Sequence, residues 1–494
     1  MAANLLGRFG LKTVAIERAA EPFPLPRAVH LDHEMMRLFQ AAGVAERVSP
    51  DVRDTDGHLH IGADNGVIRY MGTVGRPRPF GWSNDYFFYQ PELENHLRGA
   101  LAELPTVSLR LGTEVVGLSQ DDDGVTLQIR DAAGDAVARA RWVIGCDGAR
   151  STVRKLLNVA LEDLDFEEPW LVVDAEVDGA VRFPPLTGVP DDANLQKLSV
   201  MMCDPVRPCT VVPGRGNHRR WEFMLLPGED DATMMQPESV SRLIDPWLSG
   251  VPHRIVRATT YRFHGLVAKA WHVGGVFLAG DAAHQTPPFF GQGMCHGMRD
   301  VANLAWKIDH VARGAAPLAL LDTYQQERDP HVRAVITAAV DAGRYICMLD
   351  AAAAADRDAA MRKREANGAA TSTAADLIPP IRDGVVAGPS VGERFIQPRM
   401  GDGRLLDTVT GGGWRLFTTG SPAGAGLPDA IHAFDVTALD DGGAVQAWLS
   451  ARNATAVLVR PDFYVFGLAA GDLTALIGEW SHRVIGSVPI GVAA

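Results

Sequence analysis

The chain has 494 residues, a formal net charge of −13, 47% hydrophobic residues and 22% charged residues. This length allows two or three domains with their own cores, and the composition is that of a globular protein. The excess of acidic groups disfavours nucleic acid or an anionic membrane as a partner. No apolar run approaches the ~18 residues that a membrane-spanning helix needs. The N-terminus also lacks the layout of a signal peptide, so we expect a cytoplasmic protein.

The cysteines also favour a cytoplasmic protein. The chain contains five cysteines and no CxxC pair, at Cys146, Cys203, Cys209, Cys295 and Cys347. This spacing disfavours a zinc site or dithiol chemistry, and reduced thiols are typical of the cytoplasm. We expect no metal.

The N-terminal residues predict the end of a helix followed by a strand. Residues 4–10 end in Gly10, a common helix stop, and Thr13–Ile16 is a short apolar strand that leads into Glu17 and Arg18. A strand with an acid at its end fits the second strand of a dinucleotide-binding βαβ unit, where the carboxylate accepts a ribose hydroxyl. A solvated strand end is the alternative.

The glycine loop of such a unit lies about twenty residues before that acid. Counting back from Glu17 places the loop before Met1, and no GxGxxG motif occurs near this end. We favour a start codon placed too late or a shortened chain. The alternative is a chain that has lost affinity for its cofactor.

The next segments alternate between loops, short strands and helix starts. Residues 24–29 predict a rigid loop into a helix that begins near Asp32, and residues 56–89 predict short strands. Pro91 follows Gln90 in the first turn of a predicted helix. Residues 107–129 alternate as a strand meander does, with a turn at residues 121–124.

Two later stretches combine a buried strand with a glycine-containing turn. Residues 142–144 precede Gly145–Ser151, and Ser151 is a suitable N-cap for the following helix. Residues 276–279 predict a buried parallel strand, which ends at Gly280-Asp281 and leads through a proline-rich turn to a helix opened by Gly291 and Gly293. The helical spacing of Met298, Val301, Ala305 and Ile308 predicts its apolar face. A strand that enters a helix through glycines favours anions, and Asp281 is placed to accept from a ribose or ribityl hydroxyl. A tight turn in any α/β enzyme is the alternative.

Between and after these stretches the pattern changes. Residues 165–265 predict an inserted antiparallel sheet, and residues 348–378 predict an exposed helix and linker. From about residue 396 an α/β pattern begins again, with strands at 414–418, 432–436 and 456–463, and helices at 444–449 and 469–477.

Three of these stretches carry a family resemblance. GDAAHQTPPFFGQGMCHGMRDVANLAWKI (280–308) resembles the second flavin fingerprint of the FAD-dependent aromatic hydroxylases, and GCDGARSTVRKLL (145–157) resembles their Asp-Gly motif. The cluster around residues 203–208, 219–224 and 227–229 resembles the 3-(3-hydroxyphenyl)propionate hydroxylases specifically. The resemblance runs from Asn4 to about Gly467. It departs from the family in the missing first strand and loop, and at His30, where relatives carry a smaller residue.

The resemblance implies which residues contact the cofactor and the substrate. In the family the Asp-Gly motif also serves nicotinamide binding, and the first proline of the turn lies against the isoalloxazine. The implied FAD-binding residues are Glu17, Arg18, Arg27, Gln90, Asp147, Arg150, Gly280, Asp281, Ala282, Ala283, Pro288, Gly291, Gln292, Gly293 and Met294. Arg27 as a surface residue and Gln90 as a helix-start residue are the alternatives. Arg207, Arg219 and Arg220 are candidates to neutralise a substrate carboxylate, although such residues are usually solvated.

The resemblance also implies the reaction. NADH or NADPH reduces FAD, molecular oxygen forms a flavin hydroperoxide, and a phenolic substrate such as 3-(3-hydroxyphenyl)propionate is hydroxylated ortho to its hydroxyl group. The predicted catalytic residues are Pro287, beside the flavin, and His284, which with His296 is a candidate to help deprotonate the phenol; a packed histidine is the alternative for each. A non-catalytic remnant of the fold and a hydroxylase of larger polyketide rings remain alternatives for the function.

The implied fold is α/β. It comprises a discontinuous, Rossmann-like FAD-binding domain without its first strand (1–60, 90–160 and 266–345) and an antiparallel substrate domain (61–89 and 161–265). A helical linker (346–395) and a thioredoxin-like domain (396–494) follow. The last domain has no cysteine, so we expect it to be structural or to form a homodimer contact.

Overall fold

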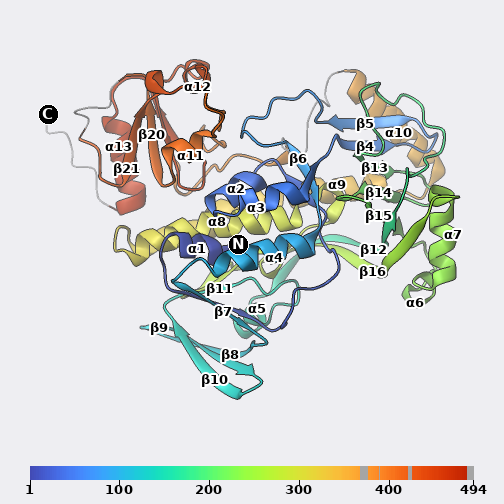
Figure 1. Ribbon diagram of the computed structural model, residues 1–494, viewed down its shortest axis with the longest axis horizontal. Coiled ribbons are helices and arrows are strands. Elements are labelled where there is room, and N and C mark those ends of the chain that lie inside the picture. Colours follow the sequence, from blue (N-terminus) through green and yellow to red (C-terminus); the bar gives the residue numbers. More distant parts are fainter. Residues whose placement is uncertain (368–376, 389, 421–425, 487–494) are drawn as a thin grey trace.

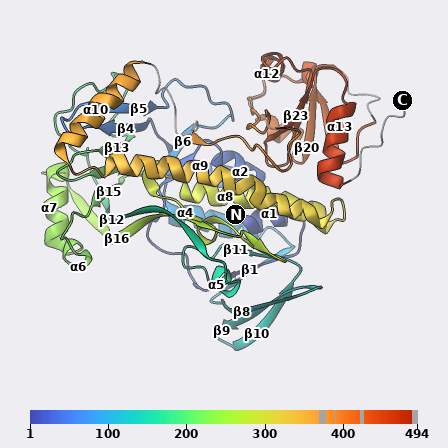
Figure 2. The same ribbon diagram turned by 180° about the vertical axis from the view of Figure 1, so that it is seen from behind.

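The computed structural model describes residues 1–367, 377–388, 390–420 and 426–486. Three parts lie side by side in Figure 1: a central part with the long helices, a large sheet on one side, and a small C-terminal unit on the other. Figure 2 shows the same order from behind, with one long helix extending from the central part to the large sheet. Among the described residues, no helix is long and apolar enough to cross a bilayer.

The central part contains parallel strand pairs. Strand β1 (Thr13–Glu17) pairs in parallel with β7 (Val107–Leu111), and β11 (Val143–Gly145) pairs in parallel with β18 (Val276–Leu278). The short strand β17 (His272–Val273) completes the second sheet. The strands predicted at residues 13–16, 142–144 and 276–279 are therefore confirmed. The helices of this part are α1 (Ala2–Arg8), α4 (Gln90–Leu101), α5 (Thr152–Leu156), α8 (Gly293–Ala312) and α9 (Thr323–Ile346).

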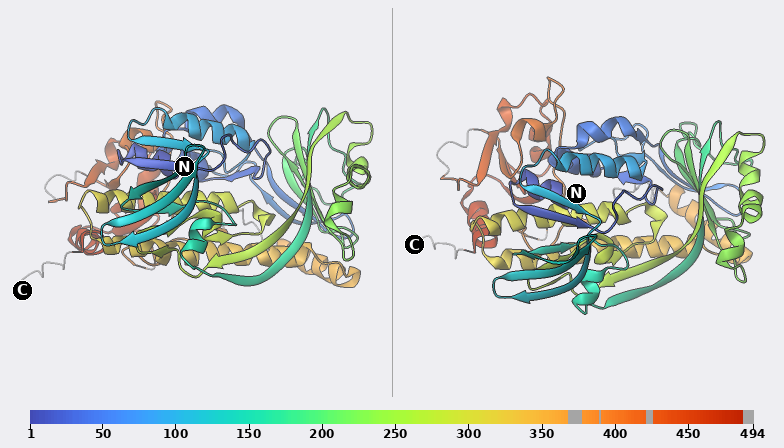
Figure 3. Two further views of the ribbon diagram at one scale, coloured as in Figure 1. Left: turned by 90° about the horizontal axis from the view of Figure 1, so that it is seen from below. Right: turned by 60° about the horizontal axis from the view of Figure 1, so that its bottom comes forward.

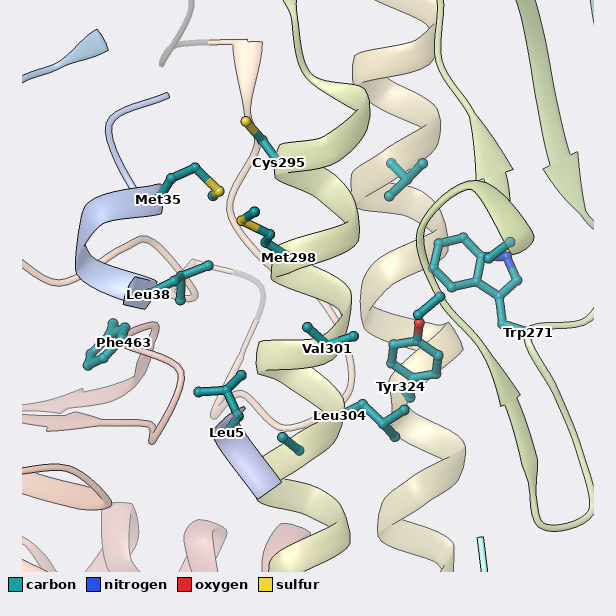
Figure 4. Close-up of a cluster of buried hydrophobic side chains, with 14 of the residues drawn as sticks. Leu5, Met35, Leu38, Trp271, Cys295, Met298, Val301, Leu304, Tyr324 and Phe463 are labelled. Atoms are coloured by element: carbon teal, nitrogen blue, oxygen red, sulfur yellow. The ribbon is translucent and has the colours of Figure 1, made fainter. Parts of the chain in front are cut away.

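Helix α8 lies at the centre of the main hydrophobic core. Its predicted apolar face is buried, with exposed fractions of at most 6% at Met298, Val301, Ala305 and Ile308. Figure 4 shows that the helix is packed on both sides: Leu5 and Leu38 lie on one flank, and Tyr324 and Trp271 on the other. Burial of this stripe fixes the position of the glycine turn at the start of the helix.

The large sheet has eight strands in the order β19-β16-β12-β15-β14-β13-β4-β5. Its two longest strands, β12 (Leu161–Val177) and β16 (His253–Ala268), pair with each other in antiparallel orientation. The other strands are β4 (Gly57–Ile61), β5 (Val67–Gly72), β13 (Leu198–Met202), β14 (Cys209–Pro213), β15 (His218–Met224) and β19 (His284–Gln285). The predicted antiparallel sheet is confirmed, except that β13 pairs with β4 in parallel.

The two faces of this sheet have different partners. Helices α6 (Asp231–Met234) and α7 (Pro237–Leu248) lie against the outer face, where Trp221, Phe223 and Ile244 belong to a separate core. The inner face is turned towards the central part (Figure 3). The sheet therefore forms a wall opposite the parallel strands.

Smaller elements complete the central part. A three-stranded sheet joins β2 (His30–Asp32), β6 (Asp85–Phe88) and β3 (Val52–Asp54), and the helices α2 (Met35–Ala41) and α3 (Ala45–Val48) connect β2 to β3. The helix predicted near Asp32 thus begins later, because residues 30–32 pair with β6. The meander predicted over residues 107–129 is confirmed for β8 (Glu114–Asp121) and β9 (Gly124–Asp131), which are joined by the predicted turn at residues 121–124 and followed by β10 (Gly134–Ala140). It is wrong for residues 107–111, because β7 pairs in parallel with β1 instead.

The C-terminal unit is a four-stranded α/β layer. Its strand order is β21-β20-β22-β23, with β20 and β21 parallel and the remaining pairs antiparallel. The helix predicted over 469–477 is wrong in its first half, because the apolar residues before it form β23 and pair with β22. The elements are α10 (Ala351–Ala366), α11 (Leu406–Thr410), β20 (Trp414–Thr418), β21 (Ile431–Asp435), α12 (Ala444–Ser450), β22 (Ala456–Val459), β23 (Val465–Ala469) and α13 (Thr474–Trp480).

Buried ion pairs fasten this unit to the central part. Glu327 on α9 accepts from Arg460 at 2.7 Å and lies 2.9 Å from Lys307 Nζ on α8, while Asp462 also accepts from Arg460 at 2.7 Å. Burial lowers the pKa of Lys307 to about 8. Although burial opposes it, the facing cations Arg460 and Lys307 lower the pKa of Glu327 to about 2. The C-terminal unit is therefore an integral part of the folded chain.

Candidate active site

The two motif turns leave the sheet at the same edge. Strands β11 and β18 are adjacent and parallel, with Gly145 in register with Leu278, so the turns that carry Asp147 and Asp281 begin side by side. The backbone N–H of Ala279 donates to the carbonyl of Gly145 at 3.0 Å, and Arg154 donates to the carbonyl of Ala282 at 2.9 Å. The two motif segments therefore converge in space. Ligands of open parallel sheets bind at such an edge.

The turn after β18 requires glycine at two positions. Gly280 adopts φ +60°, and a Cβ atom on Gly297 of α8 would lie 3.0 Å from the Cα of Gly280. The two backbones approach this closely because neither residue has a side chain. The turn is thereby held against the first turns of α8.

Asp300 on α8 holds the turn in place through hydrogen bonds. Its Oδ2 accepts from the backbone N–H of Gly280 at 3.0 Å and lies 2.6 Å from His284 Nε2, and its Oδ1 accepts from Arg328 Nε at 2.9 Å. Asp300 and His284 are fully buried, and Arg328 is 1% exposed. Burial opposes ionisation of Asp300, but the facing His284 and Arg328 outweigh it and lower the pKa of this carboxyl. The carboxylate fixes the turn through three partners.

The histidines near the fingerprint belong to this buried cluster. His284 bonds to Asp300, and His296 Nδ1 accepts from Arg328 at 3.2 Å. Burial and the nearby Arg299 and Arg328 lower the pKa of His296, which keeps the ring neutral and able to accept. Both side chains have 0% exposure. The structure therefore gives His284 a packed position, the alternative stated above, because Asp300 draws it into the core.

From the surroundings of two exposed side chains we infer a cleft above the turns. The side chains of Asp281 and Cys146 are exposed to solvent, yet protein surrounds them closely enough to raise the pKa of Asp281 and to raise the pKa of the Cys146 thiol to about 11. The same burial lowers the pKa of the Met1 amino group, which is close enough to Cys146 for their charges to interact. Exposed groups that are poorly solvated mark the floor of a concave site.

The start of α8 faces open space. A Cβ atom on Gly293 would have no atom within 4 Å, and Gly291 adopts φ +63°. Gly293 and Met294 are partly exposed, while Gln292 is fully buried. The first N–H groups of this 20-residue helix lack intrahelical partners. The helix start can therefore accept an electron-rich group of a ligand.

His30 packs beneath Gly291. A Cβ atom on Gly291 would lie 2.5 Å from the His30 ring, and His30 Nε2 hydrogen-bonds to Asp85. Burial acts to lower the pKa of His30, but Asp85 outweighs it, so that the pKa is raised. His30, the position at which the sequence departs from the family, is therefore held between Gly291 and Asp85.

Residues 26–28 are clamped between the central part and the large sheet. Gln90 Oε1 accepts from the backbone N–H groups of Arg27 and Ala28 at 3.1 and 2.8 Å. From the opposite side, Arg220 and Arg257 donate to the carbonyl of Pro26 at 2.8 and 2.6 Å. The Arg27 side chain is exposed and close enough to Asp281 for its charge to act on that carboxyl. Gln90 therefore positions this segment beside the cleft.

The remaining predicted cofactor residues lie around the same edge. Glu17 accepts from the N–H of Ala19 at 2.8 Å, and Asp147 caps α5 by accepting from Ser151 and from the N–H of Val153. Arg18 and Arg150 are exposed, Pro288 is partly exposed, and Ala282, Ala283 and Pro287 are buried.

The predicted substrate arginines all have partners within the protein. Arg207 forms a bidentate pair with Glu229 at 2.9 and 2.5 Å. Arg219 lies on the outer face and donates to the carbonyls of Gly216 and His218. Arg220 is buried and paired with Asp174 at 2.8 Å. A role in binding a substrate carboxylate stays a prediction, and this geometry does not favour it.

Sequence reasoning missed Asp300, Asp174 and Arg257. Each acts on a backbone group or a charge that is remote in sequence, as Arg257 does on Pro26. Spacing in the sequence does not relate such positions to one another. Only Asp300 could have been noticed, because it lies on the predicted helix of the fingerprint.

The comparisons with known proteins agree with this geometry. The family model described as FAD binding domain matches residues 1–339, and the chain belongs to this family. It is an FAD-dependent monooxygenase of the aromatic hydroxylase class, as the fingerprint predicted.

Two curated relatives and two solved structures illustrate the match. A probable NADH-specific resorcinol 4-hydroxylase of Rhodococcus jostii (strain RHA1) is 35% identical, covering 99% of this chain and 93% of the relative. A 3-(3-hydroxy-phenyl)propionate/3-hydroxycinnamic acid hydroxylase of Burkholderia cenocepacia (strain HI2424) is 36% identical, covering 94% and 90%. The flavin-dependent monooxygenase PieE, solved with FAD and substrate, has a TM-score of 0.79 at 24% identity, covering 98% and 96%. OxyS anhydrotetracycline hydroxylase from Streptomyces rimosus has a TM-score of 0.77 at 24% identity, covering 99% and 97%. These structures support the fold.

Proposed function

We propose that the chain hydroxylates a small phenol at a ring carbon next to the hydroxyl group, with FAD as cofactor and NADH or NADPH and molecular oxygen as co-substrates. One oxygen atom enters the ring, the other leaves as water, and the reduced nicotinamide supplies two electrons. The observation that carries the proposal is the convergence of the two motif turns at the edge of β11 and β18, where Asp281 is open to solvent yet surrounded by protein.

The residues around this cleft suit FAD. Asp281 offers a carboxylate to the ribityl hydroxyls, Glu17 offers one to the ribose, and the open helix start at Gly293 and Met294 offers donors to the electron-rich edge of the ring. Arg27 and Arg150 are exposed cations near the same edge, suited to the phosphates or to a docking nicotinamide. We propose that the remaining FAD-binding residues predicted from the sequence contact the cofactor as well.

When bound, FAD supplies hydride acceptance and oxygen activation, which no side chain provides. The chain's own contribution is to orient the rings and exclude water. Pro287 and Phe289, on the turn before α8, would form one wall of the reaction space. The inner face of the eight-stranded sheet would form the other.

The relatives suggest the size of the substrate. Their names specify resorcinol and 3-(3-hydroxyphenyl)propionate, which are both single phenolic rings with a meta substituent. Coverage of these relatives by 90% or more, at 35–36% identity, favours a small phenol over a fused polyketide ring.

Finer features of the organisation belong to the same proposal. The C-terminal strand order, with one parallel and two antiparallel pairs, supports a thioredoxin-like unit without thiol chemistry. We also propose the discontinuous domain organisation predicted from the sequence, a cytoplasmic location and a homodimer formed through the C-terminal unit. The five cysteines are free thiols, which supports that location.

Product analysis of the FAD-saturated protein tests the function. With resorcinol or 3-(3-hydroxyphenyl)propionate, we expect one ring-hydroxylated product for each NADH or NADPH oxidised, and labelled oxygen from labelled O₂ in that product. The same mixture without a phenol is the control. Nicotinamide oxidation that yields only hydrogen peroxide with every single-ring phenol would argue for a larger ring, and absence of turnover with all of them would refute the proposal.

A further inference from the structure

One strand of the large sheet points an acid towards the proposed reaction space. Side chains alternate along β15, so Trp221 and Phe223 face the outer core while Arg220, Glu222 and Met224 share the inner face. Glu222 is therefore on the wall that faces the central part (Figure 3).

Two contacts bracket Glu222 on this wall. On one side, Arg220 donates to the carbonyls of Arg27 and Pro26 at 2.6 and 2.8 Å. On the other, Met224 is in register with Trp170, whose ring meets Phe289 edge to face with centroids 5.9 Å apart. Glu222 thus lies between the two segments, 26–28 and 287–290, that flank the proposed flavin position.

Space remains in front of Glu222. Its strand neighbours Arg220 and Met224 and its cross-strand partners Val172 and Thr210 are all buried, yet the Glu222 side chain is 14% exposed. This exposure at the centre of a covered sheet indicates a void against the carboxyl group.

The Glu222 carboxyl has no hydrogen-bond partner within the part of the chain that the structure describes. Arg220 Nη1 lies 4.0 Å away, but the Arg220 side chain already donates to Asp174 and to the two carbonyls. Burial raises the pKa of Glu222 to about 7, with a smaller contribution from Asp174 in the same direction and an opposing one from Arg220. An unpartnered polar group that faces a void is suited to a ligand.

We propose that Glu222 accepts a hydrogen bond from a ring hydroxyl of the substrate, and that the preferred substrate is an uncharged di- or trihydroxybenzene. This inference rests on the proposed function and names its substrate class. A carboxylate on the substrate would meet the acid, and the three predicted substrate arginines and Arg257 all have partners within the protein. A hydroxyl group instead supplies the missing donor.

The test compares wild type with Glu222→Gln. The matched control is Glu176→Gln on β12, an exposed acid paired with Arg254. For each FAD-loaded protein, kcat and KM are measured with resorcinol and with 3-(3-hydroxyphenyl)propionate. Resorcinol affinity is measured separately from the perturbation of the flavin spectrum.

In wild type we expect a preference for resorcinol, with kcat/KM rising through pH ~7 because the ionised carboxylate is the stronger acceptor. In Glu222→Gln, kcat/KM should no longer rise through pH ~7. The variant should bind resorcinol about tenfold or more weakly, and the change in kcat/KM should come mostly from a higher KM. The variant should discriminate less against the carboxylate substrate. Glu176→Gln should match wild type.

Equal behaviour of Glu222→Gln and Glu176→Gln with both substrates would overturn the inference, and so would a wild-type preference for the carboxylate substrate. The affinity measurement separates this inference from the proposed function. If wild type binds resorcinol through Glu222 but forms no product, only the hydroxylase proposal fails. If it forms product equally well without Glu222, only the present inference fails.

Discussion

Replacement of Asp300 by alanine is expected to lower the free energy of unfolding by about 3–5 kcal/mol, because it leaves the buried Arg328 without its counter-charge. Arg328 is 1% exposed, and its other recorded side-chain contacts are to the rings of His296 and His331. Both rings are neutral, because burial and the nearby arginines lower their pKa values. Denaturant unfolding followed by tryptophan fluorescence measures the loss.

The same change should also weaken FAD binding in molecules that remain folded. Gly280 loses the acceptor for its N–H group, and the turn that carries Asp281 is released from α8. Asp329→Ala is the matched control, since Asp329 forms a partly exposed pair with Arg333 one helical turn away on α9. That pair should contribute less than about 0.5 kcal/mol. Equal stability losses for the two variants would refute the role given to Asp300.

Replacement of Arg460 by alanine should be similarly costly. Arg460 and Glu327 are fully buried and Asp462 nearly so, and removal of the arginine leaves two carboxylates facing Lys307 alone. We expect a loss of about 3–5 kcal/mol. The C-terminal unit should then unfold separately from the central part. Trp306 of α8 and Trp414 of β20, whose rings meet with centroids 5.5 Å apart, report on this interface through their fluorescence.

The half-exposed pair between Arg452 and Glu393 supplies the control. Arg452→Ala should cost less than about 1 kcal/mol and leave a single unfolding transition. A single transition with wild-type stability in Arg460→Ala would mean that the buried ions do not hold the two parts together.

The elements that sequence reasoning predicted well depend on local pattern. The apolar residues before Gly280 and the stripe Met298, Val301, Ala305 and Ile308 were sufficient to predict β18 and α8, because burial of one strand or one helix face leaves a periodic signal. The turn at residues 121–124 was equally local. The last predicted helix was placed too early, at Ala469 instead of Thr474, and no strand was predicted at residues 465–468. A short apolar run carries no period of its own, and pairing with β22 decides that these residues form β23.

The parts that escaped prediction depend on distant partners. Strand β4 pairs in parallel with β13, which lies about 140 residues later in the chain, and no feature of residues 57–61 predicts this pairing. His284 lies within the fingerprint, yet Asp300 draws its ring into the core. Glu222 sits in a motif that was noticed for its arginines, and only the strand register shows that the acid faces inward.

Titration of the purified chain with FAD, followed by the visible flavin spectrum, tests whether the turns that carry Asp147 and Asp281 bind the cofactor. We expect a saturable spectral change with the wild-type chain. Asp281→Ala should bind about tenfold to a hundredfold more weakly, through loss of charge-assisted hydrogen bonds to the cofactor. Asp322→Ala, which alters an acid whose side chain is 70% exposed, should bind as wild type does. A well-folded chain that leaves the flavin spectrum unchanged at saturating FAD would contradict the account.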